Sequence, residues 1–146
     1  LADQLPKEQV GARIHHHLRA MDLEDYKGSY PGKLSGGQRQ RAAMARALAF
    51  PSRLLLMDEP FKSLDLGLKY ELIARFLDLW QKEPRTVLLV THDPKEALLL
   101  ADVIYLLSPR PASIIGRYTP ALPQTQRELG SLDLLRLEQQ ILKKLL

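Results

Sequence analysis

The stretch Leu54-Leu55-Leu56-Met57-Asp58-Glu59-Pro60 decides the fold class of this chain, because a wholly apolar run ends abruptly in two carboxylates. A short run with no polar residue is typical of a strand buried on both faces of a sheet. Similar runs follow at 87–90 and 103–107, with helical patterns between them at about 68–81 and 94–101. Apolar strands that alternate with helices predict an α/β protein, with a parallel sheet covered on both faces.

Polar residues at the ends of these strands are the first candidates for a functional site. Asp58 and Glu59 follow the first strand, and His92 and Asp93 follow the second. Ligands of open parallel sheets bind beyond the carboxyl ends of the strands. Buried carboxylates are costly unless they are paired or bind a metal ion. Taken alone, Asp58 could equally cap a helix or pair with an arginine, so the carboxylate pair leaves both interpretations open.

The stretch Leu34-Ser35-Gly36-Gly37-Gln38 precedes an alanine-rich helical segment that stops before Pro51. A serine hydroxyl and two glycine amides at a helix N-terminus favour anion binding, because the N–H groups are free and no Cβ hinders a phosphate. A lone Ser-Gly-Gly would be only a turn. Specificity comes from the order of the parts that follow it: Gln38-Arg39-Gln40-Arg41, Asp58-Glu59-Pro60, Leu64-Asp65 and His92.

In this order the motifs resemble those of ATP-binding-cassette (ABC) ATPases, over about residues 30–107. The signature motif, the Walker B strand, the D-loop and the switch histidine are matched by 34–38, 54–59, 63–65 and 91–93. The resemblance implies the C-terminal portion of a P-loop NTPase-type (RecA-like) parallel sheet flanked by helices, with part of the ABC helical subdomain.

The resemblance also implies a role in ATP hydrolysis for each residue at the strand ends. Asp58 would hold Mg²⁺, through water, as hard oxygen ligands do. Glu59 would orient and polarise the attacking water, and Pro60 would bias Glu59 toward an extended backbone. His92 would hydrogen-bond the γ-phosphate and sense its departure. ATP and Mg²⁺ are thus the expected cofactors.

The remaining matched residues are expected to act between two subunits. Asp65 would work across a dimer interface, and the ATP site of the second subunit would be completed by Ser35, Gly36, Gly37 and Gln38. The implied partners are a second ABC ATPase subunit, an integral membrane permease and, indirectly, a periplasmic or surface substrate-binding protein. The expected location is the cytoplasmic face of the cell membrane. No nucleic-acid partner is expected, because no long coiled-coil insertion precedes the signature.

Details of the motifs resemble bacterial importer ATPases, and in particular the branch that serves nitrate, sulfonate, taurine and thiamine-precursor uptake. Tyr30-Pro31, Phe61 and the run 107–111 carry this likeness, whereas Lys62 stands where that branch usually has a small residue. Two alternatives stay open: a non-transport ABC ATPase and a degenerate regulatory subunit. Glu59 and His92 argue against the degenerate subunit, since a dead site needs neither.

The phosphate-cradling motif G-x-x-x-x-G-K-[ST] is absent from these 146 residues. The segment 28–34 imitates it, but it is one residue short, ends in Leu34 and follows no apolar strand. Because the chain also begins at Leu1 without a methionine, we expect either a piece of a longer protein or a naturally degenerate subunit. We predict that the chain alone neither binds ATP tightly nor hydrolyses it.

The overall composition is that of an ordinary globular protein, with 45% hydrophobic residues and a formal net charge of +4. The absence of cysteine excludes disulfides and thiolate sites. We expect three parts: residues 1–50 with the signature and its helix, 51–110 as the C-terminal half of the catalytic core, and 111–146 as a short strand, a linker and a terminal helix. The apolar stripe of that helix is expected to fold back on the core, with a partner contact as the alternative.

Three further groups of residues have structural interpretations. His15, His16 and His17 point about 100° apart on a helix and so cannot share one metal ion. Phe76 and Trp80 are expected to pack in the core or between helices. Arg39 and Arg41 are expected to support the signature by contacting acidic or backbone groups.

Overall fold

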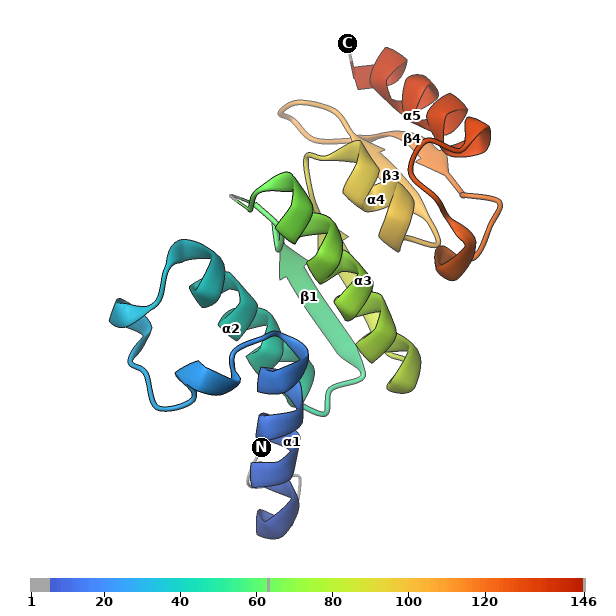
Figure 1. Cartoon of the computed structure of the whole chain (residues 1–146). Helices are drawn as coiled ribbons and strands as arrows, with labels where there is room; N and C mark the ends of the chain where they lie inside the picture. The colour runs from blue at the N-terminus through green and yellow to red at the C-terminus, as the bar shows by residue number, and fades with distance from the viewer. Residues whose placement is uncertain (1–5, 63, 146) are drawn as a thin grey trace. The chain divides into compact units, whose positions relative to one another are not determined.

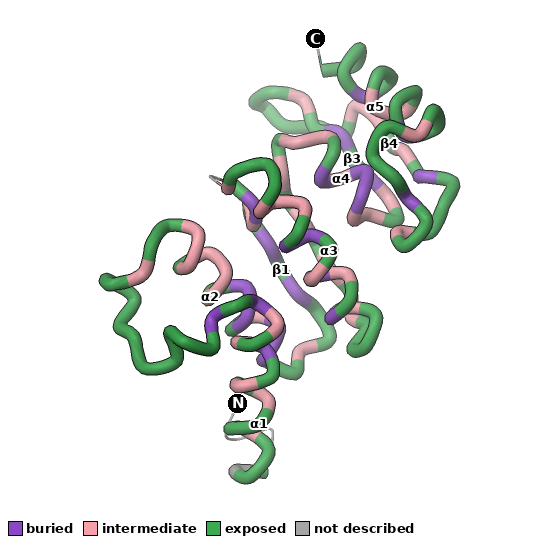
Figure 2. Tube along the Cα trace, viewed as in Figure 1, coloured by how far each residue is buried: buried purple, intermediate pink, exposed green. Residues whose placement is uncertain are grey.

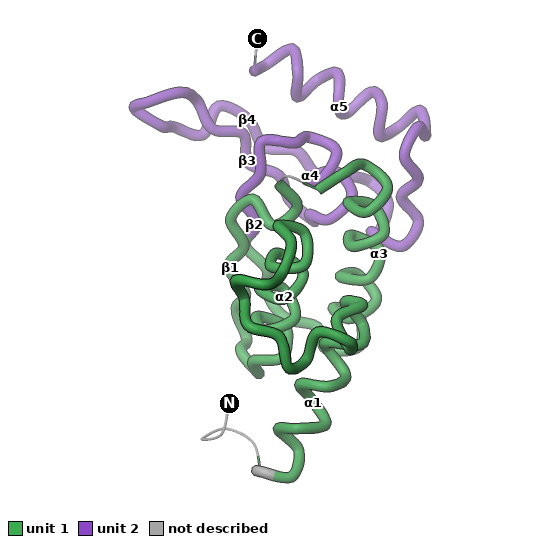
Figure 3. The backbone as a smooth tube through the Cα atoms, turned by 60° about the vertical axis from the view of Figure 1, so that its left-hand side comes forward, with its two compact units in different colours: residues 1–88 green, residues 89–146 purple. Residues whose placement is uncertain are grey.

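The computed structural model describes residues 6–62 and 64–145 (Figure 1). The chain divides into two compact units, residues 1–88 and 89–146 (Figure 3), and each is described by itself. The predicted division at 1–50, 51–110 and 111–146 concerns functional parts and stays a prediction. The elements are, in chain order, α1 (Lys7–Ala20), η1 (Glu24–Tyr26), η2 (Pro31–Lys33), α2 (Gly36–Ala49), β1 (Leu54–Asp58), α3 (Leu66–Lys82), β2 (Thr86–Val90), α4 (Pro94–Leu100), β3 (Ile104–Leu107), β4 (Ile114–Tyr118), η3 (Gln124–Gln126) and α5 (Leu132–Leu145).

The first two apolar runs form the predicted parallel sheet, in the order β1-β2. The third run also forms a strand, as predicted, but its expected place in the parallel sheet was wrong, because β3 pairs antiparallel with β4 in a separate two-stranded sheet. Ile104 lies opposite Tyr118 and Leu107 opposite Ile114. The short connection between these strands makes a hairpin possible. The Ser108 hydroxyl braces it by accepting the Ser113 N–H at 3.0 Å.

Unit 1 has an apolar core, and burial of the side chains alternates along β1. Leu55 and Met57 are buried, whereas Leu54 and Leu56 on the other face of the strand are 51% and 65% exposed. Figure 2 shows buried stretches in α2, β1 and α3. Phe76 belongs to this core, as predicted, and the half-buried Trp80 donates its indole N–H to the Arg85 carbonyl at 2.7 Å. The other large members are Met21, Leu23, Met44, Leu48, Phe61, Leu72, Ile73 and Leu79.

One face of the β1-β2 sheet is apolar and open. Leu88 of β2 is 59% exposed, like Leu54 and Leu56 of β1. The expectation that helices cover both faces is therefore not met among the described residues. An uninterrupted run of apolar residues along a strand predicts that both faces of the sheet are buried. It does not identify the segments of the polypeptide that cover those faces.

In unit 2 the terminal helix α5 packs against α4 and β4, in line with its predicted return to the core. Leu134 and Ile141 of its apolar stripe are buried. The buried Arg127, which sequence reasoning missed, joins the segment before α5 to the end of α4. Its guanidinium donates to the carbonyls of Leu98, Ala101 and Leu122 at 2.9, 2.8 and 2.7 Å. Burial lowers the pKa of Arg127, and the carbonyls at the helix terminus gain the partners that they lack within the helix.

Two of the three consecutive histidines of α1 are in contact, since the rings of His16 and His17 lie edge to face with their centroids 5.2 Å apart. His17 is buried and its Nδ1 lies 2.8 Å from the Arg13 carbonyl, whereas His15 pairs with Glu24 at 3.1 Å. Among the described residues no group of three potential ligands is arranged to hold a metal ion. In the same part of the chain, no helix combines the length and apolar character that a membrane crossing requires.

The buried His17 makes stability depend on pH. Burial is the main cause that lowers its pKa from the ordinary value of 6.5. The unfolded chain therefore binds a proton that the folded chain resists, and stability falls as the pH drops below about 6.5. We expect the free energy of unfolding to decrease between about pH 7.5 and 5.5, by at most about 1.4 kcal/mol per pH unit from this group. Urea titrations at both pH values measure this decrease.

The matched control for this prediction is the neighbouring exposed histidine. His17→Gln should reduce the pH dependence more than His16→Gln, because the exposed His16 acts on His17 only through a ring contact and its charge. The pKa values of Glu24 and Glu83 are lowered by Arg19 and Arg13, so these carboxylates lose stabilising ion pairs only at more acidic pH. An equal pH dependence in the His17→Gln variant would contradict the assignment to His17.

Candidate functional site

The predicted anion-binding N-terminus of α2 is built by a reciprocal cap. The Ser35 hydroxyl accepts the Gln38 N–H at 3.2 Å, and the Gln38 side-chain oxygen accepts the Ser35 N–H at 2.8 Å. These two bonds fix the entry of the chain into the helix. A Cβ added at Gly36 would meet no heavy atom within 4 Å, so the space beside this amide is open. The geometry thus fits the close approach of a phosphate to the first-turn N–H groups.

The same helix end lies against the segment that leads into α3. A Cβ at Gly37 would stand 3.4 Å from the Leu64 side chain and 3.7 Å from that of Leu68. Asp65 caps α3, since its carboxylate accepts the Leu68 N–H at 3.0 Å. This capping role starts the helix at Leu66, two residues before the predicted start. Gly37 of the predicted signature and Leu64 of the predicted D-loop are therefore neighbours in unit 1, whereas Ser63 of the D-loop lies outside the described residues.

Asp58 and Glu59 lie at the carboxyl end of β1. Asp58 is the last residue of the strand and is exposed, and Glu59 is half-buried. The expectation that Pro60 gives Glu59 an extended backbone is wrong, because Glu59 has a φ of 48°. This left-handed conformation is uncommon for a residue with a Cβ. Tertiary hydrogen bonds to the turn override the local preference that a following proline imposes.

Gln40 makes the tertiary bonds that hold this turn. Its side-chain Nε2 donates to the Glu59 carbonyl at 3.0 Å and to the Pro60 carbonyl at 2.5 Å. The Lys62 N–H also donates to the Glu59 carbonyl, at 3.2 Å. Sequence reasoning missed Gln40, although it stands in the run Gln38-Arg39-Gln40-Arg41. The sequence feature that could have indicated this role is a second glutamine, one turn after the start of α2. It lies on the side of α2 that bears half-buried residues.

The two arginines beside Gln40 contact different segments: Arg39 contacts the signature itself, and Arg41 contacts the segment after α1. Arg39 donates to the Leu34 carbonyl at 2.6 Å and so closes the segment before the cap. Arg41 donates to the Met21 carbonyl at 3.2 Å and lies 4.0 Å from the carboxylate of Asp22. The prediction that these arginines contact backbone or acidic groups is confirmed.

His92 lies in unit 2, on an ordered loop between β2 and α4. It is exposed, and its neighbours hold the loop. The Thr91 hydroxyl donates to the buried Glu96 at 2.6 Å and accepts the Asp93 N–H at 3.1 Å. Asp93 caps α4 by accepting the Lys95 N–H at 2.9 Å. A loop held at both ends suits a side chain that must contact a ligand in a defined direction.

The described residues meet some of the requirements for binding a nucleotide together with Mg²⁺. Mg²⁺ binds through one or two carboxylates together with water and substrate phosphates, and Asp58 offers one exposed carboxylate. The segment that imitates a phosphate-cradling loop ends in η2 and follows the turn η1, not a strand.

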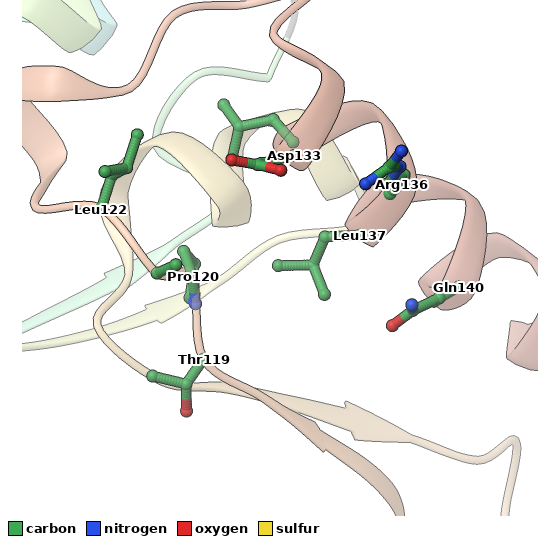
Figure 4. Close-up of a pocket in the computed structure, with 9 residues that line it drawn as sticks. Thr119, Pro120, Leu122, Asp133, Arg136, Leu137 and Gln140 are labelled. Carbon is green, nitrogen blue, oxygen red and sulfur yellow. The ribbon is translucent and has the colours of Figure 1, made fainter.

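A separate pocket in unit 2 lies between the 119–122 segment and α5, where Leu137 points into it (Figure 4). None of the predicted site residues lines this pocket.

Residues 3–62 match the ABC transporter family. The chain is 47% identical over 103 residues to the sulfate/thiosulfate import ATP-binding protein of Gloeobacter violaceus. The aligned residues are 70% of this chain and 30% of the relative. It is 42% identical over 129 residues to the aliphatic sulfonates import ATP-binding protein of Shigella flexneri serotype 5b, with 88% and 49% covered. The chain therefore spans less than half the length of either relative.

The fold is similar to that of a solved ATP-binding cassette of an ABC transporter. The alignment has a TM-score of 0.69 and covers 96% of this chain and 51% of the solved chain. The sequence identity is 21%, so this likeness concerns the α/β fold alone. It extends the similarity to nearly the whole chain, beyond the 3–62 region that matches the family.

Proposed function

Because the chain belongs to the ABC transporter family of ATP-binding proteins, we propose that the whole protein is the ATP-hydrolysing subunit of a bacterial ABC importer. The observation that carries this proposal is the arrangement of unit 1. There the capped N-terminus of α2, with an open Gly36 amide, shares a helix with Gln40, which contacts the turn after Asp58 and Glu59. An anion site and a carboxylate pair are thus connected by one short helix.

In this proposal the two carboxylates at the end of β1 have different tasks. Asp58 would hold Mg²⁺, a role that suits its exposed position, and the ion would supply positive charge to neutralise the phosphates. Glu59 accepts a proton from the water that attacks the γ-phosphate. A general base at this place contributes about 10²–10⁴-fold to the rate. His92 donates a hydrogen bond to the γ-phosphate from its held loop.

The signature residues serve the nucleotide of a second copy of the protein. Ser35, Gly36, Gly37 and Gln38 present amide and hydroxyl groups on an exposed helix end, and Asp65 lies exposed beside it. Two subunits would enclose two ATP molecules, and loss of the γ-phosphates would open the interface. The motion would pass to a membrane permease at the cytoplasmic face of the membrane. The relatives are named for sulfate and for sulfonates, so the cargo is not assigned.

The open face of the β1-β2 sheet supports the view that these residues work as part of a larger domain. Leu54, Leu56 and Leu88 form an apolar surface of the kind that a parallel α/β sheet covers with further polypeptide. The relatives are more than twice as long as the part they share with this chain. We therefore assign this face to the remainder of the same domain, and the ATPase activity to the whole protein.

The proposal is tested with the whole protein by ATP hydrolysis and sedimentation. ATP with EDTA should shift the protein from monomer toward dimer, because the nucleotide binds and no Mg²⁺ supports its cleavage. ATP with Mg²⁺ should yield phosphate release and a smaller dimer fraction. A protein that neither releases phosphate nor dimerises with ATP would contradict the proposed function.

A further inference from the structure

We propose that Gln40 is a positioning residue for Glu59 and links the direction of this carboxylate to the position of the signature helix. The inference rests on the proposed role of Glu59 as the general base. Gln40 itself touches no reacting atom in this scheme. It acts through the backbone of the turn that carries Glu59.

The first step of the argument is the conformation of the turn. Glu59 has a φ of 48°, a conformation that a residue with a Cβ retains only where its surroundings hold it. The Gln40 Nε2 donates to two successive carbonyls of the turn, that of Glu59 at 3.0 Å and that of Pro60 at 2.5 Å. The Phe61 side chain that follows is completely buried and anchors the other end of the turn. These contacts therefore hold the backbone from which the Glu59 side chain extends.

The second step is the chemistry of residue 40. Two carbonyl oxygens converge on one nitrogen, and a carboxamide NH₂ supplies the two protons that they require. Leucine fills a similar volume but donates nothing, and an ionised glutamate presents only acceptors to the two oxygens. Glutamine is thus suited to this position by its donors as well as its size.

The third step is the place of Gln40 in α2. It stands four residues after Gly36, which is one helical turn, so the open amide and the Gln40 side chain move with the same rigid helix. A displacement of α2 caused by nucleotide at its N-terminus would be transmitted directly to the carbonyls of Glu59 and Pro60. Binding of nucleotide by the signature and orientation of the base are thereby coupled.

The experiment measures steady-state ATP hydrolysis by the whole protein with Gln40→Leu, Gln40→Glu and the control Gln81→Leu, which changes an exposed glutamine of α3. We expect kcat to fall by about 10- to 100-fold in both Gln40 variants at neutral pH, with KM for ATP nearly unchanged. The control should match the parent protein. Gln40→Leu in a Glu59→Gln background should cause no further loss, since the two residues act as a unit.

The pH profile separates positioning from packing. A glutamate at position 40 regains one O–H donor when it is protonated, and its hydrogen bonds to carbonyls favour that neutral form. The ratio of kcat for Gln40→Glu to that of the parent protein should therefore rise as the pH is lowered from about 8 to 6. The same ratio for Gln40→Leu should stay flat. If Gln40→Leu does not fold, the pH dependence of kcat in Gln40→Glu still tests the inference.

Two results would overturn the inference and leave the proposed function intact. One is parent-like kcat in the Gln40 variants while Glu59→Gln is inactive. The other is equal loss in both variants that follows the folded fraction and shows no pH-dependent recovery. Retained turnover in Glu59→Gln would instead contradict the proposed function itself.

Discussion

Glu59→Gln in the whole protein is expected to lower ATP turnover by about 10²–10⁴-fold, the usual contribution of a positioned general base. The amide keeps the size of the side chain and cannot accept the proton of the attacking water. The turn should persist, because Gln40 holds it through the carbonyls of Glu59 and Pro60, which the substitution leaves in place. Phosphate release at saturating ATP with Mg²⁺ measures the effect.

Nucleotide binding should survive this substitution, so the variant should accumulate as the ATP-bound dimer. Sedimentation with ATP and Mg²⁺ is expected to show a larger dimer fraction than for the parent protein. Glu8→Gln, which changes an exposed glutamate of α1, provides the matched control and should hydrolyse ATP at the parental rate. Turnover retained by the Glu59→Gln variant would exclude Glu59 as the base.

The second large effect concerns the 146-residue chain by itself. It is expected to show no ATP turnover and no saturable ATP binding below about 1 mM. Its sequence has no G-x-x-x-x-G-K-[ST] loop, so the phosphates would meet only the amides at the start of α2 and one carboxylate, Asp58. Titration calorimetry with ATP and Mg²⁺ measures the binding. The whole protein, titrated under the same conditions, is the positive control.

Tight stoichiometric binding by the short chain would contradict this prediction. It would mean that the described residues supply a triphosphate site of their own. Circular dichroism of the same sample must show folded protein, since an unfolded chain would give the expected negative result without testing it. The pH-dependent stability assigned to His17 gives an independent check that the native core of unit 1 has formed.

Most elements were predictable because their signals are local. The apolar runs predicted β1 and β2, and the alanine-rich run predicted α2, with boundaries that differ by one or two residues. For the two helices α2 and α3, the difference at the start has a cause in capping. Ser35 and Asp65 accept N–H groups of their own helices, and so α2 and α3 start earlier than the apolar periodicity suggests. Capping residues are visible in a sequence, but periodicity alone does not include them.

The failures concern choices that depend on distant partners. An apolar run such as 103–107 fits a parallel or an antiparallel strand equally well, and only pairing with β4 decided between them. Proline after Glu59 favours an extended backbone, yet hydrogen bonds from another helix stabilise the left-handed turn. Arg127 has no local pattern at all. Its role follows from three carbonyls that lie 5 to 29 residues away along the chain.

The amino-acid sequence by itself determined the class of fold, the order of the motifs and the candidate residues at the strand ends, because strand burial, helix starts and motif spacing are properties of neighbouring residues. Only the tertiary structure decided how these residues are held. The link between α2 and the Glu59 turn is made by one side-chain amide and two carbonyls, 19 and 20 residues apart in the chain. Such a contact depends on the packing of the helix against the end of β1, and no local preference specifies it.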